Sequence, residues 1–133
     1  MEVKVSEETY NFYLALDEWT PVVGHEVKVG EFKFAAIPNK EQIIILEVTS
    51  GAFVQNIPMD ILTFILTSTK EKAVDYLKKV VGETLKQGLE KNDNVIEMIT
   101  QMREKSLKRL GEMPPIYEVD IEAMLIKENR QLH

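Results

Sequence analysis

The sequence predicts an α+β fold, in which an antiparallel sheet of three or four strands from the first half of the chain is covered on one face by helices from the second half. Apolar and charged residues alternate over residues 26–36, as in strands with one buried face. Apolar residues recur every three or four positions over residues 74–110, as in amphipathic helices. The length of 133 residues suits one domain with one core. We therefore expect one α+β domain over 1–133, strand-rich over 1–58 and helical over 59–133, with a possible docking segment over 114–133.

The first element, residues 7–19, fits two patterns. Its apolar residues alternate as in a strand, and they are Tyr10, Phe12, Leu14 and Leu16. Ser6, followed by two glutamates, is instead typical of a helix start, because acidic residues are favourable near the positive end of the helix dipole. We favour a helix that ends at Thr20-Pro21, and the strand remains the alternative.

Residues 22–54 read as a meander of strands. The alternation of apolar and charged residues shifts by one position across Gly30, which predicts a bulge or a tight turn there. Residues 43–46 are a run of three isoleucines and a leucine, typical of a strand that is buried on both faces. This run is the expected central strand, and residues 52–55 can add a short fourth one.

The remaining residues read as helices. Asp60 can cap the segment ILTFIL, which is apolar nearly all round and is therefore expected to be a short helix buried in the core. Ser68 and Glu71 form a capping-box pattern before a second helix. Asn94 precedes a third helix, which Gly111 can end. A last short helix is expected from residue 120 to about residue 131.

Composition excludes several classes of function. The chain has no cysteine, so it has neither disulfides nor cysteine-ligated metal sites, which is compatible with a cytoplasmic location. A formal net charge of −6 opposes general binding to nucleic acid or to anionic membranes. Neither a signal peptide nor a membrane-spanning segment is expected.

The stretch GHEVKV around His25 is the nearest approach to a catalytic signature. A zinc protease needs a second histidine four residues after the first, and Val29 stands there. Strand alternation also puts Glu26 on the opposite face from His25. Phosphate-binding loops, nucleophile elbows and dinucleotide fingerprints are missing from the sequence. We therefore assign no catalytic residue, no cofactor and no metal site, and we favour a protein that is not an enzyme.

Trp19 and the basic residues near the third helix each have two interpretations. Trp19 either packs in the core or lines a ligand pocket together with His25. The basic cluster either binds phosphate or stabilises a helix C-terminus, and the acidic chain favours the second interpretation. This cluster comprises Arg103, Lys105, Lys108 and Arg109.

The C-terminal segment, which follows Pro114-Pro115, is amphipathic and too short to be stable alone in water. It is expected to dock either on its own core or on a second protein. The residues predicted for a partner interface are Ile116, Tyr117, Ile121, Met124 and Leu125.

The function predicted from the sequence is a small, soluble, non-catalytic protein–protein interaction or adaptor protein that forms homo-oligomers. Its expected partner is a second copy or another protein, with no nucleic acid and no membrane. The alternative is a small-molecule-binding protein or modest hydrolase with a pocket near Trp19 and His25.

Overall fold

The structure is a computed structural model that describes residues 1–120, and it is an α+β fold built on an antiparallel sheet of seven strands. The strand order is β6-β5-β4-β3-β2-β7, and β1 pairs with β3 outside this path. The strands are β1 (Val3–Val5), β2 (Thr9–Ala15), β3 (Trp19–Val29), β4 (Phe32–Pro38), β5 (Gln42–Glu47), β6 (Ala52–Pro58) and β7 (Tyr117–Val119).

Strand β3 is the longest strand and changes neighbours along its length. Its first half, residues 19–24, pairs with β2, whereas residues 25–29 pair with β4 and residues 27–29 also pair with β1. A Cβ atom built on Gly24, at the junction, would lie 2.0 Å from the carbonyl oxygen of Ala36. The missing side chain therefore lets β3 approach β4 closely where it changes partners.

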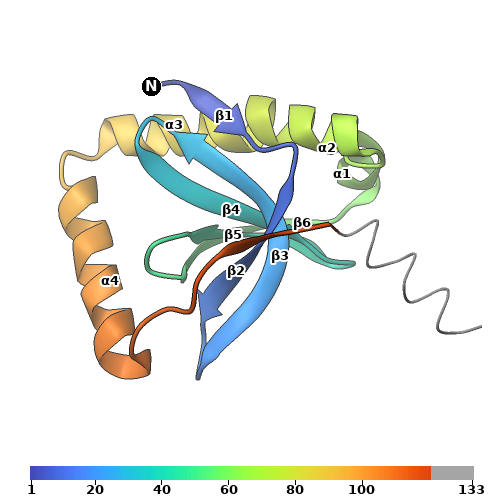
Figure 1. The fold of residues 1–133 in the computed structure, drawn as a ribbon. Coiled ribbons are helices and arrows are strands. Elements are labelled where there is room, and N and C mark those ends of the chain that lie inside the picture. Colours follow the sequence, from blue (N-terminus) through green and yellow to red (C-terminus); the bar gives the residue numbers. More distant parts are fainter. Residues whose placement is uncertain (121–133) are drawn as a thin grey trace, which may run out of the picture.

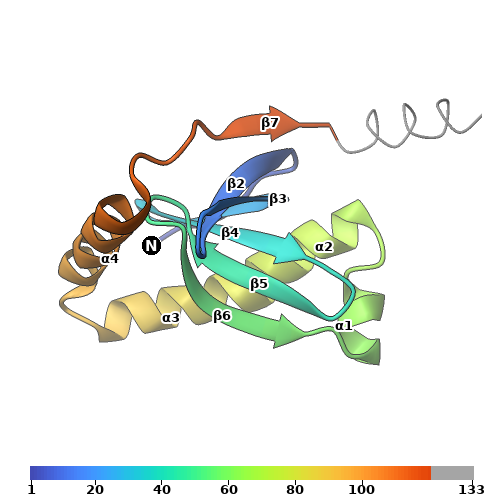
Figure 2. The same cartoon turned by 90° about the horizontal axis from the view of Figure 1, so that it is seen from below.

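Three helices lie between β6 and β7 in the described part of the chain. The first is α1 (Ile61–Leu66), and the last is α4 (Val95–Leu110). Between them, α2 (Lys70–Tyr76), the π-helical turn η1 (Leu77–Gly82) and α3 (Glu83–Lys91) run on as one long helix. The long helix crosses one face of the sheet, while α4 stands beside the sheet (Figure 1). Figure 2 shows the long helix behind β5 and β6, with α1 at the end of β6.

The sheet has buried side chains on both faces. One cluster joins Val27, Ile45 and other strand residues to Leu77 and Val81 of the long helix. The second cluster joins Phe12 of β2 to residues of β4 and β5. The long helix therefore covers one face of the sheet, and β2 covers the other face at β4 and β5. Strand β2 can do so because the sheet is twisted.

The prediction of an α+β fold is confirmed, whereas the sheet is larger than the three or four strands expected. The predicted helix over residues 7–19 is wrong, because this region forms β2 and the start of β3. Ser6 does not cap a helix, and its hydroxyl instead accepts a hydrogen bond from the amide of Glu26 at 2.9 Å. Pro21 does not end the element, because it lies in the half of β3 that pairs only with β2.

Other local predictions are confirmed. Gly30 has a φ of 61° and makes the tight turn between β3 and β4. Residues 43–46 lie in β5, which is an interior strand, and they contribute to both clusters. The prediction that Ser68 caps the long helix is, by contrast, wrong, because Thr69 caps it: the hydroxyl of Thr69 accepts from the amide of Lys72 at 3.2 Å. The helix expected from residue 120 onward lies outside the described residues.

Candidate interaction site

Helix α1 is the main departure from the sequence-based interpretation. Asp60 caps it as expected, because its carboxylate accepts a hydrogen bond from the amide of Thr63 at 2.7 Å. The expected burial in the core is wrong, since Thr63 is the only buried residue of the helix. The exposed fractions of its apolar residues are 81% for Ile61, 65% for Leu62, 63% for Phe64, 52% for Ile65 and 42% for Leu66. A helix that is apolar nearly all round therefore lies on the surface, and exposed apolar patches of this kind are candidates for interaction sites.

The carboxylate of Asp60 should make the order of α1 depend on pH. Hydrogen bonds from Thr63 lower the pKa of Asp60 below its ordinary value of about 4. The cap is therefore fully present at neutral pH, and it is lost as the pH falls through the lowered pKa. We expect the protection factors of the amides in residues 61–66, which are the intrinsic exchange rates at each pH divided by the observed rates, to fall in acid for the wild type. The protection factors should be low at every pH in Asp60→Ala, and they should be high and independent of pH in Asp60→Asn; equal protection factors in all three proteins would contradict this role.

Strand β6 continues the apolar surface of α1. It stands at one end of the strand order, and among residues 1–120 it pairs with β5 alone. Phe53 and Val54 expose 56% and 38% of their surfaces. We call residues 52–69, which contain β6 and α1, the neutral surface, because Asp60 is their only charged residue. At the chain average of 29% charged residues, about five would be expected in this segment.

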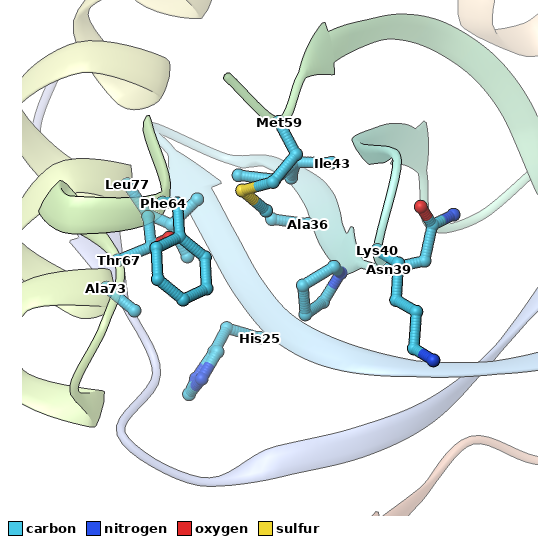
Figure 3. A pocket seen from close by; sticks show the side chains of 11 residues that line it. His25, Ala36, Asn39, Lys40, Ile43, Met59, Phe64, Thr67, Ala73 and Leu77 are labelled. Atoms are coloured by element: carbon cyan, nitrogen blue, oxygen red, sulfur yellow. The ribbon is translucent and has the colours of Figure 1, made fainter. Parts of the chain in front are cut away.

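A cavity of about 500 Å³ lies between the sheet and the inner side of α1. Figure 3 shows Phe64 and Leu77 on the helical side of this α1 cavity, His25 near them on β3, and Lys40 on the side of the β4–β5 turn. The apolar residues that line the cavity are Ala36, Pro38, Ile43, Met59, Phe64, Ala73 and Leu77. Its few polar lining residues are His25, Asn39, Lys40 and Thr67. The cavity is therefore suited to apolar side chains or to a mostly apolar molecule.

His25 lies in strand β3, as its sequence pattern predicts, and it lines the α1 cavity. Its Nδ1 atom is 2.8 Å from the carbonyl oxygen of Ser6, so Nδ1 carries the hydrogen and donates it. His25 also lines a second hollow of about 460 Å³. This acidic hollow is further lined by Glu7, Glu8, Thr9, Lys70, Glu118, Val119 and Asp120. His25 thus separates an apolar cavity from a hollow rich in carboxylates.

Trp19 does not share the α1 cavity with His25. The two residues are six positions apart on β3, which corresponds to roughly 20 Å along a strand. The indole Nε1 donates to the carbonyl oxygen of Gly111 at 3.3 Å, and the ring lies over Gly51. Trp19 therefore joins the start of β3 to the end of α4.

The two arginines of the basic cluster make structural contacts. Arg103 donates to the hydroxyl of Thr49 at 3.0 Å, at the turn between β5 and β6. Arg109 donates to the carbonyl oxygens of Ala15 and Leu16, at the turn between β2 and β3. These bonds hold α4 against the ends of two hairpins, which is a structural role different from the expected stabilisation of the helix C-terminus.

The residues predicted for a partner interface are only partly described. Ile116 and Tyr117 expose 36% and 56% of their surfaces, at the start of β7. Strand β7 pairs with β2 at the other end of the strand order from β6. Ile121, Met124 and Leu125 lie outside the described residues. The structure therefore does not place Ile116 and Tyr117 in the neutral surface.

Sequence reasoning missed the exposed residues of α1 and β6 as candidate site residues. Their apolar character suggested burial, and only the lack of charge over residues 52–69 could have indicated an interface. Among residues 1–120, no group of three or more His, Cys, Asp and Glu side chains is placed to hold a metal ion. In the same residues, no helix is both long enough and apolar enough to cross a lipid bilayer. Comparison with protein-family models, curated proteins and solved structures finds no match to this chain.

Proposed function

We propose that this protein is a non-catalytic protein–protein interaction protein that self-associates through the neutral surface. The observation that carries the proposal is the exposure of five of the six residues of α1, directly after a strand whose outer edge pairs with no other strand of the described chain. Monomeric proteins rarely expose contiguous apolar patches of this kind, and they usually protect edge strands with charges. Strand β6 has no charge at all.

A second copy fits this surface for electrostatic reasons. In a two-fold dimer built on one strand, a residue near the axis faces its own counterpart, and the other residues of the strand face one another across the axis, so a charge near the centre of the strand would lie close to a like charge. Strand β6 is free of this penalty. Two copies that each carry a net charge of −6 repel one another elsewhere, and the neutral surface is where they can approach most easily. We therefore place β6 against β6, with α1 of each copy completing the apolar contact.

The solution mass of charge-insertion variants tests this proposal. We expect the wild type to run as a dimer in light scattering after size exclusion, and Phe53→Lys and Ile61→Glu to run as monomers. Burying one Ile side chain contributes about 2 kcal/mol, and each substitution acts twice in a two-fold interface, so the dissociation constant should rise by roughly 100-fold or more.

The matched control is Ile96→Glu on α4, because Ile96 is 72% exposed and lies outside the neutral surface. This variant should remain a dimer, and all three variants should keep the circular dichroism spectrum of the wild type. A wild type that stays monomeric over the whole accessible concentration range would refute the proposal. A dimer that survives both substitutions in the neutral surface would refute the proposed location.

A further inference from the structure

We propose that the α1 cavity binds a small amphiphilic carboxylate, with the apolar tail beneath α1 and the carboxylate at the β4–β5 turn. This site uses the inner side of α1 and does not depend on self-association through β6. The cavity volume of about 500 Å³ lies in the range of small-molecule sites, which are mostly apolar and hold a few polar groups that orient the ligand. Seven of the eleven lining residues are apolar, and the four polar ones are divided between the two ends of the cavity.

The end of the cavity beneath α1 suits an apolar tail. The hydroxyl of Thr67 donates its hydrogen to the carbonyl oxygen of Thr63 at 2.8 Å, and the Nδ1 hydrogen of His25 is donated to Ser6 at 2.8 Å. With His25 neutral, these two side chains therefore have no hydrogen left to donate to a ligand. Phe64 lines the same end while exposing 63% of its surface, and a tail placed against it would remove this surface from water.

The end at the β4–β5 turn presents side-chain donors to a ligand. The Oδ1 atom of Asn39 accepts hydrogen bonds from the amides of Glu41 and Gln42 at 2.9 and 2.8 Å. These bonds fix the orientation of the side chain and leave its Nδ2 group, which has two hydrogens, without a partner among residues 1–120. The ammonium group of Lys40 also has no partner in this part of the chain. A carboxylate only accepts hydrogen bonds, so it matches both groups.

Charge places the carboxylate at the same end. With histidine neutral, Lys40 is the one charged residue in the lining of the α1 cavity, and it lies on the opposite side from Leu77 (Figure 3). His25 separates the other side from the acidic hollow, whose lining contains four carboxylates and one lysine. A carboxylate near His25 would be repelled by these groups, whereas one at Lys40 would be attracted.

Isothermal titration calorimetry on the full-length protein tests the head group and the tail separately. We expect octanoate to bind, 1-octanol to bind about 5-fold more weakly, and octyltrimethylammonium to bind about 10-fold or more weakly still than octanoate. From hexanoate through octanoate to decanoate, the affinity should rise about four-fold for each added methylene group until the cavity is full.

Two variants address the two ends of the cavity. Lys40→Met removes the charge and should weaken the binding of octanoate about 5-fold while leaving that of 1-octanol unchanged. Its matched control is Lys72→Met, because Lys72 is exposed on α2 and lies outside the lining. Ala73→Leu enlarges a side chain in the cavity wall and should weaken both ligands about 10-fold or more, with an unchanged circular dichroism spectrum.

Ile61→Gln separates binding in the cavity from binding to the outer surface of α1. Ile61 is 81% exposed and does not line the cavity, so this variant should bind octanoate as the wild type does. Loss of binding in Ile61→Gln, or unchanged binding in Ala73→Leu, would place the ligand outside the cavity and overturn the proposal.

The head-group series can overturn the proposal in three further ways. Equal affinity for the three octyl compounds would show that the carboxylate is not recognised. Tighter binding of the ammonium compound would place its head group at the acidic hollow. No measurable binding of any of them at millimolar concentration would show that the cavity is not a site for such molecules. None of these results bears on self-association through the neutral surface, which the mass of Phe53→Lys reports separately.

Discussion

Gly24→Ala is expected to prevent stable folding. The added Cβ would lie 2.0 Å from the carbonyl oxygen of Ala36 and 2.9 Å from its carbonyl carbon. These are backbone atoms of the neighbouring strand, so the clash can be relieved only by separating β3 from β4. Loss of this pairing should cost more than about 4 kcal/mol, which is a large part of the 5–15 kcal/mol that stabilises an ordinary domain.

The matched control for this substitution is Gly88→Ala. Gly88 lies within α3, and a Cβ atom there would have no neighbour within 4 Å. Alanine is the better helix former, so this variant should be more stable than the wild type by up to about 1 kcal/mol. Thermal unfolding followed by circular dichroism compares the two variants. A Gly24→Ala protein that melts within a few degrees of the wild type would contradict the close approach of β3 and β4.

Glu47→Ala should give the second largest loss of stability. Glu47 is 2% exposed, and its carboxylate accepts hydrogen bonds from the amides of Thr49 and Ser50 at 2.8 and 2.9 Å. It also accepts from the hydroxyl of Thr49, which in turn accepts from Arg103 of α4. Alanine would leave the two amides without these partners and would loosen the turn that holds α4. We expect a loss of about 3 kcal/mol, because bonds to charged groups are strong and buried donors are costly to leave unpaired.

Two variants control for this effect in urea unfolding. Glu41→Ala removes an exposed carboxylate and should change the free energy of unfolding by less than about 0.5 kcal/mol. Glu47→Gln keeps one acceptor oxygen and should lie between the wild type and Glu47→Ala. Hydrogen exchange in α4 should accelerate in Glu47→Ala before the sheet opens. A loss no larger than that of Glu41→Ala would show that this carboxylate does not organise the turn.

Elements with strong local signals could be predicted from the sequence. The alternation over residues 26–36, the turn at Gly30 and the capping residue Asp60 each depend on neighbours within a few positions. His25 was correctly placed in a strand for the same reason. The neutral surface and the α1 cavity could not be predicted, because they depend on which apolar residues other elements cover.

The structure of residues 7–19 and the burial of the segment ILTFIL could not be predicted from neighbouring residues alone. Residues 7–19 satisfy a helix pattern and a strand pattern equally well, and pairing with β3 decides between them because it buries Phe12 and Leu14 on the sheet. The helical conformation of ILTFIL was predicted correctly, whereas its burial was not. The long helix already covers that face of the sheet, so α1 remains outside it.

By itself, the sequence determined the α+β class, the turn at Gly30, the helix cap at Asp60 and the absence of cysteine chemistry, because these follow from residue type and short-range spacing. Only the tertiary structure decided the number of strands, the second cover formed by β2 and the exposure of α1. Those features depend on contacts between residues far apart in the chain. The sequence of one helix or strand does not show which of its apolar side chains another element will bury.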